Sequence, residues 1–170
     1  MPFPFLPTWI TTDVTQIQPN FLKSRGIRLV MLDFDNTIVP YTRDIPDVAV
    51  ENWLKEVSDS GLSVCVVSNS KRDRVKTFCK KYGLSCITHA KKPFSKGIRE
   101  CLGKFRVPAK EAVMVGDQIY TDTLGGGGAG VRTILVKSIH NHTIWLKLRH
   151  VTELPFILLA KKRRLPNEKS

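Results

Sequence analysis

The chain has 170 residues and lacks the features that mark several common protein classes. No apolar run approaches the ~20 residues that cross a bilayer. The first basic residue is Lys23, so the N-terminus has no positively charged region of the kind that opens a secretory signal. The four cysteines show no C-x-x-C spacing, which favours buried thiols over zinc ligands or disulfides. These absences lead us to expect a cytoplasmic protein.

Acidic residues are also scarce. The chain has 15 Asp and Glu against 27 Lys and Arg, which gives a formal net charge of +12. Such a surplus attracts polyanions, which include nucleic acid, an anionic membrane surface and phosphorylated substrates. Charge alone does not separate these partners. A composition of 42% apolar and 25% charged residues is that of a globular protein, and the length fits one domain over residues 1–170.

Apolar segments of strand type alternate with segments of helical periodicity from residue 27 to residue 136. The expected strands are 27–32, 62–67, 85–88, 112–115 and 132–136, and the expected helices are 47–61, 72–83 and one that begins at Pro93. This alternation predicts an α/β fold with a mainly parallel central sheet and helices on both faces, a Rossmann-like three-layer sandwich. We take residues 27–136 as the core of the domain.

Polar side chains follow four of these strands. Asp33 and Asp35 come after the first strand, Ser68 after the second, Lys92 after the third and Asp117 after the fourth. The carboxyl ends of parallel strands share one edge of a sheet, where ligands bind. Mg²⁺ prefers oxygen ligands and commonly lies between carboxylates and a substrate phosphate. A carboxylate can attack phosphorus, and a lysine can stabilise the charge that develops. The pattern therefore predicts a magnesium-dependent phosphoryl-transfer site.

Four motifs in order resemble those of haloacid-dehalogenase-like (HAD) phosphohydrolases. The segment "DFDNT" (33–37) is similar to the D-x-D-x-T motif of that family. Ser68 matches the hydroxyl of the second motif, Lys92 matches the lysine of the third, and "GDQIYTD" (116–122) matches the acids of the fourth. The resemblance implies a phosphatase with a HAD-like fold that works through an aspartyl-phosphate intermediate.

The same resemblance implies a role for each residue. Asp33 is the expected nucleophile and Asp35 the general acid and base. The expected Mg²⁺ ligands are Asp33, Asp117 and the backbone carbonyl of Asp35, whereas Asp122 is expected outside the first ligand set or bound through water. Ser68 and Lys92 complete the catalytic set. Thr37 and Asn69 are expected beside the substrate or behind these residues.

Two segments bear on access to the expected site. The loop after Thr37 and the stretch between Ser70 and Lys92 are too short for a cap domain, so we expect an open site that meets a phosphate on a macromolecule or membrane. The run "GGGGAG" (125–130) formally fits the dinucleotide pattern G-x-G-x-x-G. That pattern should directly follow a strand and open a helix, whereas this run precedes a strand, so we reject it. The sequence leaves open whether the run is ordered.

The capless layout and the motifs resemble the YqeG-like branch, which includes phosphatidylglycerophosphate phosphatases. This resemblance implies a lipid head group as substrate. Residues 143–164 join apolar residues to a basic cluster, a combination that favours the interface of an anionic membrane. Apolar residues near the N-terminus recur at helical spacing: Leu6, Trp9, Ile10, Val14 and Ile17. Packing of both flanks on the sheet is the equal alternative to peripheral binding at the inner face of the membrane.

Two other functions stay open. One is a capless HAD phosphatase that acts on another phosphate, such as a nucleic-acid end, a phosphoprotein or a soluble phosphoester. The other is a basic protein that binds RNA or the ribosome. The full set of acids, hydroxyl and lysine favours an enzyme over a binding protein. His140, His142 and His150 show no ligand spacing, so we expect no metal role for them.

Overall fold

The computed structural model describes residues 5–70, 73–139 and 144–166, and within 144–160 it describes side chains from residue 151 onward. The three histidine side chains considered above therefore lie outside the described residues. Among the described helices, none is both long and apolar enough to span a bilayer.

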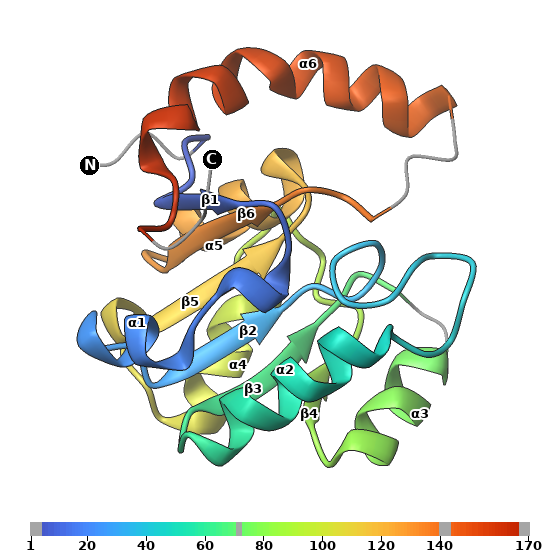
Figure 1. Cartoon of the computed structure of the whole chain (residues 1–170), viewed down its shortest axis with the longest axis vertical. Coiled ribbons are helices and arrows are strands. Elements are labelled where there is room, and N and C mark those ends of the chain that lie inside the picture. Colours follow the sequence, from blue (N-terminus) through green and yellow to red (C-terminus); the bar gives the residue numbers. More distant parts are fainter. Residues whose placement is uncertain (1–4, 71–72, 140–143, 167–170) are drawn as a thin grey trace.

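The centre of the protein is a six-stranded sheet in the order β1-β6-β5-β2-β3-β4, with every neighbouring pair parallel (Figure 1). The strands are β1 (Trp9–Thr11), β2 (Leu29–Leu32), β3 (Ser63–Val67), β4 (Ser85–Ile87), β5 (Ala112–Gly116) and β6 (Arg132–Val136). Five of the six match the strands that the sequence predicts. The central strand β2 pairs with both β3 and β5, so its carboxyl end lies between theirs.

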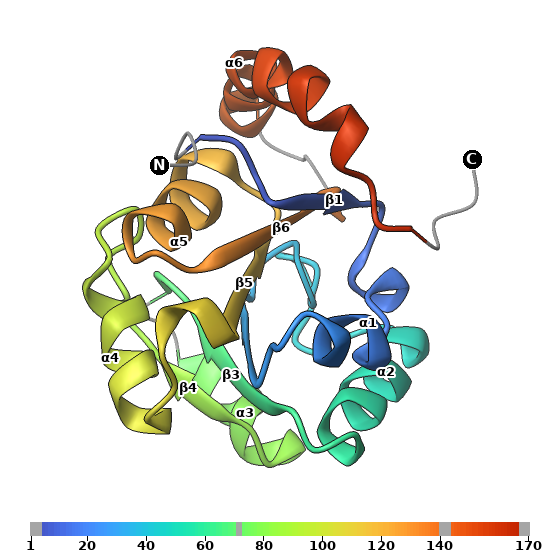
Figure 2. The same cartoon turned by 90° about the vertical axis from the view of Figure 1, so that its left-hand side faces the viewer.

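Helices cover both faces of the sheet, as predicted (Figure 2). They are α1 (Pro19–Ser24), α2 (Val48–Asp59), α3 (Asp73–Tyr82), α4 (Lys96–Phe105), α5 (Leu124–Gly128) and α6 (Ile144–Ala160). Successive strand residues point to opposite faces: Val30 and Leu32 pack with α1, α2 and α3, whereas Leu29 and Met31 pack with α4. Burial on both faces explains why the strands read as continuous apolar runs.

The structure differs from the sequence-based expectations at two places. The helical spacing near the N-terminus does not form one helix, because Trp9–Thr11 pair with β6 at the edge of the sheet and only the short 3₁₀ turn Val14–Gln16 follows. Helix α4 begins at Lys96 rather than at Pro93, after a turn in which Phe94 N–H donates to the Lys91 carbonyl. The sequence leaves the order of the glycine run open, and in the structure the run contributes to a helix, α5.

The carboxyl ends of the central strands are not covered by a cap domain. No helix or strand lies between Val39 and α2, and the described residues between Ser70 and Lys92 contain only α3 and β4. Helix α6 instead crosses above the β1 and β6 edge of the sheet (Figure 1). The expected open site therefore lies at the carboxyl ends of β2, β3 and β5, with α6 to one side.

Candidate active site

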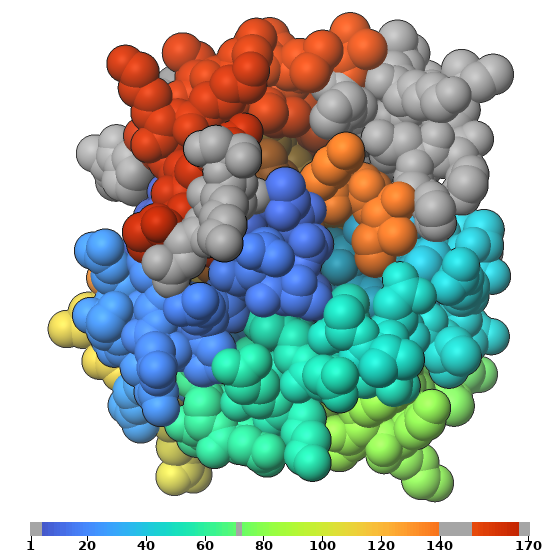
Figure 3. Space-filling view, in the orientation of Figure 1, coloured from blue at the N-terminus to red at the C-terminus, as the bar shows by residue number. Residues whose placement is uncertain are grey.

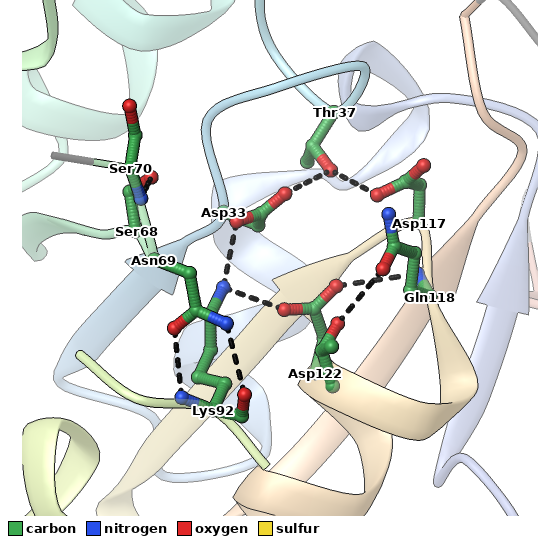
Figure 4. Close-up of polar contacts among 10 residues, drawn as sticks. Asp33, Thr37, Ser68, Asn69, Ser70, Lys92, Asp117, Gln118 and Asp122 are labelled. Carbon is green, nitrogen blue, oxygen red and sulfur yellow. Dashed lines mark hydrogen bonds and ion pairs between the residues drawn. The ribbon is translucent and has the colours of Figure 1, made fainter. Parts of the chain in front are cut away.

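Lys92 lies at the centre of a buried group of charges (Figure 4). Its Nζ is 2.6 Å from Oδ1 of Asp33, directly after β2, and 2.6 Å from Oδ1 of Asp122, in the π-helical turn η3 (Ile119–Thr123). The Lys92 side chain is 1% exposed, and the Asp122 side chain is 3% exposed. An ammonium group so far from water needs opposite charges close by. The predicted nucleophile and the predicted lysine therefore meet, as the four motifs imply.

Asp117 approaches the same group from the end of β5. The Thr37 hydroxyl lies 3.3 Å from both Oδ2 of Asp33 and Oδ1 of Asp117, and therefore bridges two acids that would repel each other (Figure 4). Oxygen atoms of Asp33, Asp117 and Asp122 all lie within 4.8 Å of one another. Closely spaced carboxylate oxygens are the donors that hard cations such as Mg²⁺ prefer, so these residues fit a divalent cation.

Burial and mutual repulsion make two of these acids harder to ionise. The pKa of Asp117 is raised well above its usual value by burial and by the charges of Asp33 and Asp122. Burial also raises the pKa of Asp122 to about 6, although Lys92 opposes the shift. Burial by itself lowers the pKa of Lys92, but the charges of Asp122 and Asp33 outweigh it and raise the pKa above its usual value. The lysine therefore stays charged.

The residues that follow β3 support Lys92 from behind. The Asn69 side chain pairs with the backbone of Lys92 twice: its Nδ2 donates to the Lys92 carbonyl at 2.9 Å, and its Oδ1 accepts from the Lys92 N–H at 2.7 Å. Two hydrogen bonds to one residue fix its position and orientation. Ser68 is buried, and its Oγ accepts a hydrogen bond from the Ser70 N–H (Figure 4). Asn69 thus holds the backbone of Lys92 in place.

Asp35 points to a different cation. Its Oδ1 is 3.1 Å from Nη1 of Arg74 on α3, and it is not in the three-acid group. Arg74 also donates to the backbone carbonyls of Pro40, Tyr41 and Arg43, and its guanidinium lies 5.0 Å from the centre of the Phe34 ring. Arg74 therefore links the predicted acid and base to the loop that follows Thr37.

Comparison with known proteins identifies the family of the chain. Residues 89–147 match a family model described as HAD-hydrolase-like. The chain is 34% identical over 132 residues to the protein of Bacillus subtilis named probable phosphatase YqeG, with 78% of this chain and 77% of that protein covered. The chain belongs to the HAD-like phosphatases.

Two further comparisons show a more distant similarity in sequence and a similarity in fold. It is 26% identical over 165 residues to the chloroplastic and mitochondrial phosphatidylglycerophosphate phosphatase 1 of Arabidopsis thaliana, which covers 92% of this chain but 47% of that protein. Its fold is similar to a 3-deoxy-D-manno-octulosonate 8-phosphate phosphatase of Moraxella catarrhalis, solved with magnesium and phosphate, with a TM-score of 0.51 and 15% identity. That match covers 84% of this chain and 98% of the other.

Three residues around the site have no counterpart among the residues that we predicted from sequence. A Cβ atom at Gly116 would lie 2.2 Å from Cγ of Asp122, so only glycine lets that acid reach Lys92. Arg74 is part of the amphipathic pattern of α3, and this pattern does not predict that Arg74 pairs with Asp35. Glu153 on α6 is buried and accepts hydrogen bonds from the N–H groups of Ile119 and Tyr120, beside Asp122. Sequence spacing contains no signal for Glu153.

Proposed function

We propose that this phosphatase hydrolyses phosphomonoesters through an aspartyl-phosphate intermediate on Asp33. The observation that carries the proposal is the pairing of Asp33 with buried Lys92, with two further acids within reach. Asp33 and Asp117, together with the backbone carbonyl of Asp35, would hold Mg²⁺. When bound, Mg²⁺ neutralises the carboxylates and attracts the phosphate oxygens. Asp122 is committed to Lys92 and to the Gln118 N–H, which agrees with a place outside the direct ligands.

The residues of this chain divide the reaction between them. Asp33 attacks phosphorus, the bond from phosphorus to the leaving oxygen breaks, and Asp35 gives that oxygen a proton. Water then attacks phosphorus, Asp35 takes its proton, and Asp33 is released with inorganic phosphate. Lys92 and the Ser68 hydroxyl stabilise the charge on the phosphoryl oxygens during both steps. The ion pair with Arg74 keeps the Asp35 carboxyl group in one orientation through both steps.

For the substrate, we propose phosphatidylglycerophosphate at the surface of an anionic membrane. The similarity to the Arabidopsis phosphatase supports this substrate. The outer side of α6 supports the membrane contact, because it exposes a row of apolar residues: Val151, Leu154, Leu158 and Leu159. Four basic residues follow at once (161–164), and all four are exposed. Apolar residues beside cations favour the interface of an anionic bilayer, where each cation contributes ~1 kcal/mol.

A panel of phosphate esters tests the substrate. Inorganic phosphate release is measured with and without Mg²⁺ from phosphatidylglycerophosphate in mixed micelles, from a 5′-phosphorylated oligonucleotide and from an aryl phosphate. We expect Mg²⁺-dependent turnover with the highest kcat/KM for the lipid. Turnover of the oligonucleotide without turnover of the lipid contradicts the proposed substrate and favours a nucleic-acid phosphatase.

Vesicle flotation tests the membrane contact. Vesicles that contain phosphatidylglycerol should carry the wild-type protein, and the double variant Leu158→Ser/Leu159→Ser should stay behind. Ile45→Ser/Val48→Ser is the matched control, since Ile45 and Val48 are also exposed apolar residues but lie outside α6. Equal recovery of the two double variants contradicts a role for α6 in membrane binding.

A further inference from the structure

A cavity of about 270 Å³ lies next to the candidate active site, among the carboxyl ends of β1 and β6 and helix α6. Its walls are mainly apolar and include Ile10, Leu135 and Ile157, whereas Lys137 and Arg164 add two cations. The three segments that form it are blue, orange and red in Figure 3 and adjoin on the face shown there. The chemistry of the walls suits an anion that also carries apolar or neutral groups.

Asp117 connects the cavity to the acids. It lines the cavity, and on its other side its Oδ1 lies 3.3 Å from the Thr37 hydroxyl that also contacts Asp33. A phosphate held beside Asp33 and Asp117 therefore has its leaving group within reach of the cavity. The volume equals that of about nine waters in the liquid, enough for a small polar fragment but not for two acyl chains.

Thr11 supplies an independent sign of a missing ligand. Thr11 is 7% exposed and lines the cavity. Among the described residues, its Oγ1 has no hydrogen-bond partner. Buried hydroxyl groups without a partner are rare in folded proteins, because the loss of hydrogen bonds to water is then not compensated. A ligand with acceptor oxygens in this cavity would provide the partner.

We infer that the cavity binds the alcohol side of the substrate and is specific for a glycerol unit that carries a phosphodiester. This inference rests on the proposed function and specifies its substrate class. The diester anion lies near Lys137 and Arg164, the glycerol unit lies against the apolar wall, and the diester oxygens accept from Thr11. Acyl chains attached to the diester leave the cavity beside Ile157 and continue over the exposed apolar side of α6, which includes Leu158.

Binding of the reaction product tests the cavity without any need for turnover. Dihexanoyl phosphatidylglycerol has the glycerol unit and the phosphodiester but no phosphomonoester, and it is titrated calorimetrically below its micellar concentration. Ile157→Trp fills the cavity, Arg164→Gln removes a cation, and Thr11→Val removes the hydroxyl at nearly constant shape. Val48→Trp is the control, since Val48 is an exposed apolar residue outside both α6 and the cavity. Thermal unfolding verifies that each variant is folded, and Thr11→Val keeps the test valid if a larger change disrupts folding.

We expect the wild-type protein and Val48→Trp to bind the lipid with similar Kd. In Ile157→Trp, the Kd should rise about tenfold or more, because the larger side chain fills the cavity. In Arg164→Gln, the Kd should rise by a similar factor, since a hydrogen bond to a charged group contributes about 1.5–3 kcal/mol. Dihexanoyl phosphatidylcholine, which has no net charge, should bind weakly to all variants. Equal Kd values across the variants, or no binding to the wild-type protein, contradict the inference.

The results separate this inference from the proposed function. If the cavity variants weaken lipid binding but phosphatidylglycerophosphate is not hydrolysed, the cavity is confirmed and the proposed substrate is wrong. If phosphatidylglycerophosphate is hydrolysed with the same KM by wild type and all cavity variants, the substrate stands and the cavity assignment is wrong.

Discussion

Two acids separated by one residue follow β2, and each is held by a different cation in a different environment. Asp33 shares Lys92 with Asp122, and the side chains of all three are at most 12% exposed. Asp35 shares Arg74 with Asp44, and these acids are 27% and 83% exposed. The same arrangement of one cation between two carboxylates thus occurs in the interior and, among the described residues, again nearer the surface, where Arg74 itself is 11% exposed.

The difference between the two groups shows which contacts hold the site together. Breaking a buried ion pair leaves a charge that water cannot solvate, whereas exposed pairs contribute little because water screens them. The Lys92 group therefore combines catalysis with stability, and the Arg74 group chiefly positions a loop and a side chain. Substitutions in the two groups should have effects of different size and different kind.

Loss of the nucleophile should have the largest effect. Asp33→Asn should lower kcat on every phosphate ester by on the order of 10⁴-fold or more, because an amide cannot form the intermediate. The fold should persist, since Lys92 keeps Asp122 as its partner. Phosphate release and circular dichroism measure the two effects. Asp44→Asn is the control and should stay within about twofold of wild type; more than 1% residual activity in Asp33→Asn would falsify the nucleophile assignment.

Removal of the buried cation should have the largest effect on stability. Lys92→Met leaves Asp33 and Asp122 without a positive partner, which should cost about 3–5 kcal/mol in urea unfolding of the metal-free protein. The loss should shrink at low pH, where protonation neutralises the acids. Lys91→Met, a change of the exposed neighbour, should stay within about 0.5 kcal/mol of wild type. Equal losses in both variants contradict a structural role for the buried lysine.

A rise in pH and the binding of Mg²⁺ should change the stability of the folded protein in opposite directions. The folded state binds the proton of Asp122 more tightly than the unfolded chain does, because the pKa is about 6 rather than 3.8. The stability from this proton is therefore present below about pH 4 and is lost as pH rises through about 6. In thermal unfolding with EDTA, stability should fall over this range relative to Asp122→Asn.

Saturating Mg²⁺ at pH 7 should restore the loss, by about 2.7 kcal/mol when the free ion is 100 times its Kd. The surface acid Asp44 provides the contrast, since Asp44→Asn should retain the wild-type response to Mg²⁺. An unfolding temperature of the wild-type protein that does not change with Mg²⁺ would contradict a cation site among these acids.

The surface group should show the smallest effect, and one that depends on the substrate. Arg74→Gln removes the ion pair with Asp35, so kcat should fall about tenfold for an alkyl phosphate, whose leaving oxygen needs a proton. An aryl phosphate should lose much less, because its leaving group departs as a stable anion. Arg74→Lys keeps the charge and should recover part of the activity. A loss of equal size on both substrates indicates a general structural defect instead.

The sequence contains enough information to predict the sheet and the expected site residues, but not how those residues pair. Buried parallel strands appear as apolar runs, and the polar residues that follow them must share one edge of the sheet. The sequence alone therefore predicts that Asp33, Lys92 and Asp117 lie close together. The contact between Asp35 and Arg74 depends on where the start of α3 lies relative to the loop after β2. That distance is set by packing and not by spacing along the chain.

In the N-terminal flank, the apolar spacing predicts the wrong secondary structure. Its apolar spacing is compatible with a helix, yet Trp9–Thr11 form a strand because β6 offers an edge with unpaired backbone groups. The glycine run is also poorly described by local propensity, because glycine weakens isolated helices and yet the run contributes to α5. At Gly126, a Cβ would lie 2.6 Å from Cγ2 of Thr133, so close packing against β6 needs a residue without a side chain.

Glu153 has a practical consequence for any study of the C-terminal segment. Because its carboxylate accepts from two amides of the turn that contains Asp122, deletion of α6 would leave two donors of the catalytic domain unpaired. A shortened protein that loses activity would then say nothing about lipid binding. Helix α6 both stabilises the turn that contains Asp122 and forms the proposed membrane contact. Only substitutions on its outward side can test the two roles separately.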